Sequence, residues 1–319
     1  MTVREWRALA LSALAALAGL CAALFLGLPQ GPGSVSGVLG MIRGPEALTA
    51  ALVGGALGLS GLLFQLVLRN GLADPYVLGI AGGSTFGAVL VTVFFGGVSA
   101  AFGLPLNAVA AFAGGLLTLF GLLRMSDGKV TTLLLGGIVA NTAFAAGARI
   151  LTAWLSPTQL AYVTAFLVGF IPTPPLWEPL LLAPPILYAL ARFAARGRGL
   201  DLLLLSDDEA SSLGLAVGRI RTEALVLATL LASSAVALCG MIGFVGLVVP
   251  HAARLTAGRR HRVLVPVSFL LGAAFLLFAH ALGKVLSGAW FLPVGVYTSL
   301  VGAPIFLVLL VRSQRRVWG

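Results

Sequence analysis

The sequence predicts an all-α, polytopic membrane protein with about ten transmembrane helices and with both termini in the cytoplasm. Hydrophobic residues make up 59% of the 319 residues and charged residues only 9%, whereas an ordinary globular domain is roughly 25% charged. Apolar runs of about 20 residues, enough to cross a hydrocarbon core of about 30 Å, recur along the chain. Lys and Arg gather at the ends of these runs, as membrane topology requires. Little is left for a soluble domain, so residues 1–319 are predicted to form a single transmembrane domain.

The apolar runs and the residues that break them predict ten spans. These cover residues 6–28, 46–68, 76–96, 104–124, 130–153, 175–195, 220–241, 243–257, 263–284 and 294–312. The eighth span is short for a full crossing, and Pro250 inside it predicts a helix that kinks or ends early. We expect a tilted helix or a half-helix at this position.

The first span resembles a signal peptide, because Arg4 and Arg7 precede an apolar run that reaches Leu28. That run is longer than the 7–15 residues of a typical signal core, and it lacks a convincing small-x-small cleavage site after it. A lipoprotein site at Cys21 is also disfavoured, since the bulky Leu20 precedes it. The segment is therefore predicted to be an uncleaved first helix.

The distribution of basic residues sets the orientation. With the N-terminus inside, all but three of the 20 Lys and Arg residues lie at cytoplasmic ends, and the exceptions are Arg43, Arg149 and Lys284. Removing the eighth span would place the basic residues near the C-terminus outside. This pattern accounts for the net charge of +10, so no nucleic-acid partner is expected.

Three connections between spans carry distinct signals. Asn70 and Asp74 are expected to fix the polar turn RNGLADPY between the second and third spans, since their side chains hydrogen-bond to nearby backbone. Residues 29–45 predict an external loop with room for a short interfacial helix. The prolines of residues 154–174 predict an extended, semi-rigid external connection.

Small and polar residues inside the apolar segments have two interpretations. Gly79, Gly83 and Gly136 permit close approach of helices, or they form a smooth surface along a solute pathway. Asn141 is polar within an otherwise apolar helix, and it fits either a hydrogen bond between helices or a place on that pathway.

The segment from residue 199 to residue 221 holds the chain's acidic cluster and predicts a short cytoplasmic helix over about 206–215. A serine is placed to cap the N-terminus, three acidic residues in the first turn favour the helix dipole, and a glycine is placed to end the helix. The residues assigned to this helix are Ser206, Asp207, Asp208, Glu209, Ala210, Leu213 and Gly214.

The chain lacks the motifs that would give it enzymatic chemistry. It has no GxxxxGK[ST] phosphate loop, no HExxH and no GxSxG, and its two cysteines, Cys21 and Cys239, are far apart in apolar surroundings. We therefore expect no catalytic residue, metal or cofactor in this chain. An ion-coupled carrier would need ionisable groups near the membrane centre, which the spans lack, so a partner is expected to supply energy.

Six segments together resemble, in family order, the membrane permease of type II ABC importers, the FecCD-like family that takes up iron-siderophores, haem, cobalamin and some oxyanions. The likeness covers nearly the whole chain. The segments are GALGLSGLLFQLVLRNGLADPYVLGIAGG (55–83), LLLGGIVANTAF (133–144), LDLLLLSDDEASSLGLAVGRIR (200–221), GMIGFVGLVVPHAARL (240–255), HRVLVPVSFLLGAA (261–274) and LPVGVYTSLVGAPIFLVLL (292–310).

The resemblance implies ten helices per subunit and a homodimer that works by alternating access along its two-fold interface. It also implies two cytoplasmic ATPase subunits that bind ATP and magnesium, a periplasmic or lipid-anchored substrate-binding protein, and a place in the inner membrane. Residues 207–214 match the family's coupling helix, which docks into the ATPase. Iron-siderophore is the expected cargo, with cobalamin or haem as alternatives and an ion-coupled secondary transporter as the alternative of another class.

Departures from the family pattern fall mainly on the outer side. The family commonly enters its second span with Arg-Leu-Pro-Arg, whose arginines meet acids of the binding protein; here Arg43 is kept and Glu46 replaces the second arginine. Near the end of the ninth span, His280 stands for the family's Asp and Lys284 for its Arg. The resemblance therefore implies docking through Arg43, Glu46 and Lys284 to a partner whose charges differ from the usual ones. At the coupling helix, Ser206 replaces the family's Gly, which keeps a good cap.

Overall fold

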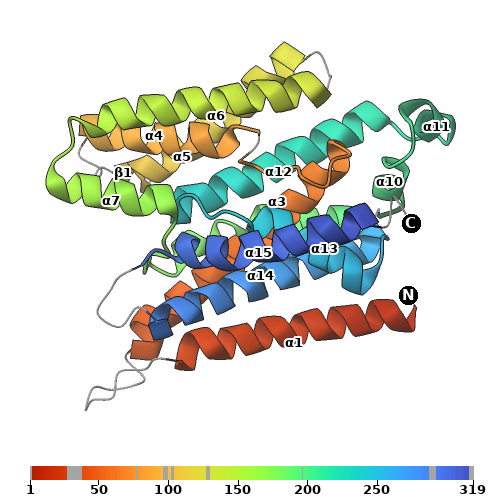
Figure 1. Ribbon diagram of the computed structural model, residues 1–319, viewed down its shortest axis with the longest axis horizontal. Coiled ribbons are helices and arrows are strands. Elements are labelled where there is room, and N and C mark those ends of the chain that lie inside the picture. The colour runs from red at the N-terminus through yellow and green to blue at the C-terminus, as the bar shows by residue number, and fades with distance from the viewer. Residues whose placement is uncertain are drawn as a thin grey trace.

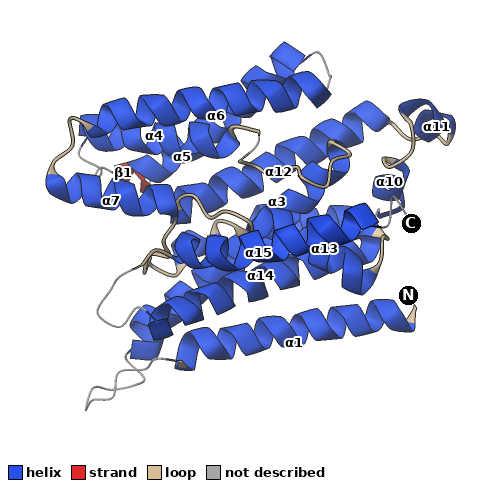
Figure 2. Cartoon of the chain, in the orientation of Figure 1, coloured by secondary structure: helices blue, strands red, loops and turns tan. Residues whose placement is uncertain are grey.

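The structure, a computed structural model, describes residues 2–26, 38–76, 78–95, 100–101, 104–126, 130–195, 197–286 and 292–315. Helices dominate these residues, as predicted (Figure 2). They are α1 (Val3–Phe25), η1 (Leu39–Arg43), α3 (Gly44–Val67), α4 (Ile80–Phe95), α5 (Leu106–Ser126), α6 (Val130–Thr152), α7 (Pro157–Val168), α8 (Trp177–Leu180), α9 (Ala183–Ala189), η2 (Leu190–Ala194), α10 (Gly197–Leu202), α11 (Asp207–Ser212), α12 (Val217–Cys239), α13 (Val245–Ala257), α14 (His261–Leu286) and α15 (Val294–Arg315). Strands β1 (Ala100–Ala101) and β2 (Leu104–Pro105) form one short antiparallel pair.

The helices form two groups that α12 joins. Figure 1 shows α4, α5, α6 and α7 on one side and α1, α3, α13, α14 and α15 on the other, with α12 between them. Helix α12 packs against α3 in the second group and against α4 and α5 in the first. This arrangement separates α6 from α15.

Helix α3 is the most enclosed of the long apolar helices, because glycines let its backbone touch those of its neighbours. A Cβ atom at Gly54 would lie 2.3 Å from the Gly272 carbonyl oxygen of α14. At Gly61 it would lie 2.0 Å from the Gly246 carbonyl oxygen of α13. In a bilayer, the hydrophobic effect does not drive helices together. Small residues at such crossings let the helices approach closely, so van der Waals packing stabilises the contact instead.

The long apolar helices make the chain a multi-pass membrane protein. Within the described residues, six helices are long and apolar enough to cross a bilayer, and three shorter apolar helices accompany them: α4, α7 and the stretch Val294–Val308 of α15. The total of ten spans stays a prediction. The short eighth span appears as α13, a helix of 13 residues that contains Pro250, as expected.

Two local predictions needed correction. The external segment 154–174 is not wholly extended, because Ser156 forms a capping box with Gln159 and starts α7 at Pro157. The sixth span is not one α-helix either. Prolines at 179, 184 and 185 lie where it divides into α8, α9 and the π-helical η2. The predicted external loop 29–45 lies partly outside the described residues, and its end continues as η1 directly into α3.

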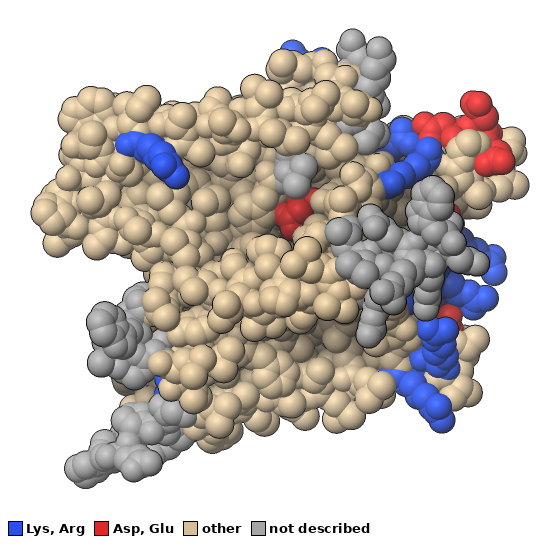
Figure 3. All heavy atoms as spheres, in the orientation of Figure 1, with Lys and Arg blue, Asp and Glu red and all other residues tan. Residues whose placement is uncertain are grey.

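Charged side chains lie mainly at one end of the molecule. In Figure 3, most of the visible Lys and Arg side chains gather at the end where Figure 1 marks both chain termini. Helix α11 lies at the same end. Since basic residues concentrate on the cytoplasmic side of membrane proteins, this end is the cytoplasmic one in the predicted orientation.

Candidate functional site

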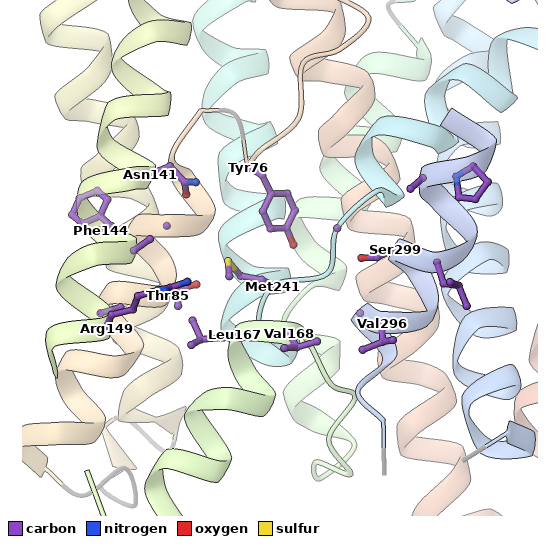
Figure 4. A pocket seen from close by; sticks show the side chains of 18 residues that line it. Tyr76, Thr85, Asn141, Phe144, Arg149, Leu167, Val168, Met241, Val296 and Ser299 are labelled. Atoms are coloured by element: carbon purple, nitrogen blue, oxygen red, sulfur yellow. The ribbon is translucent and has the colours of Figure 1, made fainter. Parts of the chain in front are cut away.

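A cavity of about 990 Å³ lies between the two helix groups. Its walls come from α4, α6, α7 and α15, together with the segments that precede α4 and α13. Figure 4 shows the side chains of α6 at one side of this space and those of α15 at the other. Most of the lining is apolar or small, so the cavity has a smooth wall with few polar groups.

The polar groups of the cavity come from separate elements. Tyr76 precedes α4, Thr85 lies in α4, Asn141 and Arg149 lie in α6, and Ser299 lies in α15. Thr85 is 3% exposed, and its hydroxyl oxygen has no hydrogen-bond partner among the described residues. The oxygen is itself buried, so it is other atoms of Thr85 that line the cavity.

Asn141, one of the residues singled out from the sequence, lines this cavity. Gly82 of α4 makes room for it, because a Cβ atom at Gly82 would lie 2.4 Å from the Asn141 Oδ1 atom. Asn141 therefore packs closely on α4 and also lies on the cavity wall, and its place on a transport pathway stays a prediction.

The three glycines singled out with Asn141 lie at helix contacts and not among the lining residues. A Cβ atom at Gly79 would lie 2.7 Å from the Gly137 carbonyl oxygen, and Gly79 also has a φ of +72°. Gly83 of α4 packs on Thr118 of α5, and Gly136 of α6 faces Leu122, which also lies in α5. Packing, the first interpretation of these glycines, therefore agrees with their contacts.

The short acidic helix forms as α11, at the position and with the cap that the sequence predicts. Ser206 is the N-cap, its side chain accepts a hydrogen bond from the Glu209 backbone, and the Glu209 side chain accepts one from the Ser206 backbone. Leu213 is the C-cap, and Gly214 follows with a φ of +80°, which favours glycine. The side chain of Ala210 faces the protein, while that of Leu213 is 62% exposed.

Ion pairs join α11 to two long helices. The Asp207 carboxylate lies 2.7 Å from Arg69 Nη2, beyond the end of α3, and 2.8 Å from Arg221 Nη2 in α12. Asp207 accepts hydrogen bonds from Arg221 and Arg69, and the one from Arg221 has the larger effect. These bonds hold the pKa of the Asp207 carboxyl below its ordinary value, so it stays ionised at neutral pH. Arg69 also donates to the carbonyl oxygens of Leu203 and Leu205. Asp207 therefore links α11 to Arg69 beyond the end of α3 and to Arg221 in α12.

At the opposite end, the residues that the resemblance assigns to docking bind groups of their own chain. Glu46 of α3 pairs with Lys284 of α14 and accepts a hydrogen bond of 3.0 Å from Thr173. His280 Nε2 lies 3.4 Å from the same carboxylate. Arg43 is 6% exposed and donates to backbone carbonyl oxygens at the end of α1. Arg43 and Lys284 are therefore both bound within the chain in this conformation, and neither is presented as a free charge to a partner. Docking through these residues stays a prediction.

Most of the chain is similar to proteins of transport systems. The model of the FecCD transport family matches residues 11–312. YvrB of Bacillus subtilis, which is named as an uncharacterised ABC transporter permease protein, is 39% identical over 279 residues, which are 86% of this chain and 78% of YvrB. The hemin transport system permease protein HmuU of Yersinia pestis is 37% identical over 282 residues, 87% of this chain and 84% of HmuU. An inward-facing structure described as a metal-chelate type ABC transporter superposes with a TM-score of 0.85 at 29% identity, covering 96% of this chain and 99% of the other.

Proposed function

This chain belongs to the FecCD transport family as a permease subunit, and we propose that it carries a ferric siderophore through a pathway between two copies of itself. It is a transport subunit and not an enzyme. In the proposal, two separate ATPase chains bind ATP and magnesium in the cytoplasm. A periplasmic or lipid-anchored binding protein delivers the cargo to the outer face of the inner membrane.

The size and lining of the cavity are the observation that supports a bulky chelate. A volume of about 990 Å³ is at the upper end of ordinary ligand pockets, roughly 300–1,000 Å³. A simple oxyanion would fill a small part of this space and would meet mostly apolar wall. In the proposal, the second copy of the chain closes the open side of the cavity, and the mostly smooth wall lets the cargo move on.

The contacts of α11 support the proposed coupling. Docking of the ATPase onto Asp208 and Leu213, which are exposed, would move Asp207 together with the helix. Asp207 holds Arg69 and Arg221, so closure of the ATPases would reach α3 and α12 through ion pairs. In the proposal, these ion pairs are the link through which ATPase closure changes the positions of the membrane helices at the cytoplasmic end.

Cobalamin and haem remain the alternative cargoes within this proposal. A secondary transporter driven by an ion gradient is disfavoured, because the family match covers residues 11–312 and no Asp or Glu lines the described part of the cavity. Proton- and ion-coupled carriers usually place such groups on their pathways.

Uptake of several chelates by the reconstituted importer tests the proposal. We would assemble the chain with its ATPase and binding protein in liposomes, and measure ATP-dependent uptake of ferric enterobactin, ferrichrome, hemin and cyanocobalamin in parallel. We expect uptake of a ferric siderophore and not of hemin or cyanocobalamin. Selective uptake of hemin or cyanocobalamin would replace the siderophore with that cargo, while failure with every chelate would refute the chelate proposal itself.

A further inference from the structure

Arg149 is the one charged side chain in the described lining of the cavity. It lies in α6, three residues before the helix ends at Thr152, so it is close to the outer end of the membrane-spanning segment. Its side chain is exposed within the chain, and it makes no hydrogen bond or ion pair with any residue that the structure describes. A charge in a membrane-spanning helix is costly, and such charges commonly mark a substrate pathway.

Arg149 differs from the two other basic residues that the predicted topology places outside. Lys284 is paired with Glu46, and Arg43 donates to carbonyl oxygens at the end of α1. Both therefore have partners that account for their positions. Arg149 has no such partner among the described residues, although it too departs from the positive-inside pattern.

The surroundings of Arg149 in the cavity offer it no carboxylate. Figure 4 shows Arg149 at the same side of the cavity as Thr85, whose hydroxyl oxygen is buried. The described lining contains no Asp or Glu. A guanidinium group presents five N–H donors and no acceptor, so this wall is suited to an oxygen-rich anion.

We propose that Arg149 forms an anion-binding subsite that makes the permease selective for negatively charged chelates. This inference rests on the proposed function and narrows its substrate class. Carboxylate or catecholate oxygens at the edge of a metal chelate accept one hydrogen bond, or two parallel ones, from the N–H groups of the guanidinium. Because Arg149 is near the outer end, an incoming chelate meets this charge early, and a cationic chelate is repelled there.

The test compares Arg149→Gln and Arg149→Lys with the unaltered chain in the complete reconstituted importer. Ferric enterobactin and hemin serve as anionic probes, and ferrichrome and cyanocobalamin as neutral probes. We expect the unaltered importer to carry an anionic probe, and we expect Arg149→Gln to raise its apparent KM on the order of tenfold, as loss of about 1.4 kcal/mol would do. Arg149→Lys should retain most of the affinity, because it keeps the charge.

Two further readouts separate recognition from a structural role. Raising the ionic strength should weaken uptake by the unaltered chain more than uptake by Arg149→Gln, since salt screens the attraction to an anion. The thermal stability of the detergent-purified variants should be unchanged. Equal KM values for the unaltered chain and Arg149→Gln, or preferred uptake of a neutral probe, would overturn this inference while leaving the importer function intact. Absence of ATP-dependent uptake by the unaltered importer would instead refute the proposed function on which it rests.

Discussion

Replacement of Asp207 by Lys will lower ATP-dependent uptake on the order of a hundredfold, which corresponds to about 2.8 kcal/mol of lost coupling. The Asp207 carboxylate is bound by Arg69 and Arg221, which connect α11 to α3 and α12. A lysine would place a third cation among them and push α11 away. The fold should survive, since exposed ion pairs contribute only about 0.2–1 kcal/mol each. Uptake and ATP hydrolysis, measured together in liposomes, will show whether the two processes have separated.

A charge exchange makes this prediction specific. Asp207→Arg combined with Arg221→Asp restores an opposite-charge pair between α11 and α12, so it should recover part of the lost uptake. Glu178→Lys in α8 makes the same change of charge away from α11 and should leave uptake near the unaltered level. Unimpaired uptake by Asp207→Lys would show that the ion pairs do not transmit the motion of α11.

Replacement of Ala145 by Trp will abolish uptake while ATP hydrolysis continues. Ala145 lies on the α6 wall of the cavity, and an indole there would occupy space that a bulky chelate needs. Because Ala145 is exposed within the chain, the larger side chain should not disrupt its core. The measurement is the ratio of chelate carried to ATP hydrolysed, which should fall toward zero.

Ala113→Trp is the matched control for the blocked cavity. Ala113 is also an exposed alanine in a long helix, α5, but it is not among the residues that line the cavity. Uptake by Ala113→Trp should remain close to that of the unaltered chain. If Ala145→Trp transported as well as Ala113→Trp, the cavity would not be the pathway.

Features that depend on neighbouring residues in the sequence were predictable. The position of α11 follows from the serine cap, the acidic first turn and the glycine after the helix, all within nine residues, and the structure forms it there. The short α13 follows from its brief apolar run and Pro250. In both cases, local backbone chemistry determines where the helix begins or ends.

Features that depend on distant residues were not predictable. Arg69 and Asp207 are 138 residues apart, and Glu46 and Lys284 are 238 apart, so only the packing of helices reveals that they pair. Thr85 and Ser299 were missed because a hydroxyl in an apolar helix does not show which neighbour it faces. The signal was present as hydroxyl residues within the apolar α4 and α15, but the same signal occurs at Ser60, whose hydroxyl donates to a backbone carbonyl.

The most direct test of the central claim is whether uptake requires ATP and the ATPase chain. The chain would be reconstituted in liposomes with its binding protein and the ATPase, and uptake of the preferred chelate would be measured with and without ATP inside the liposomes. Parallel samples would contain the chain without the ATPase, under an imposed proton or sodium gradient. We predict uptake only when both ATP and the ATPase are present. Uptake that is driven by an ion gradient without the ATPase would contradict the importer assignment.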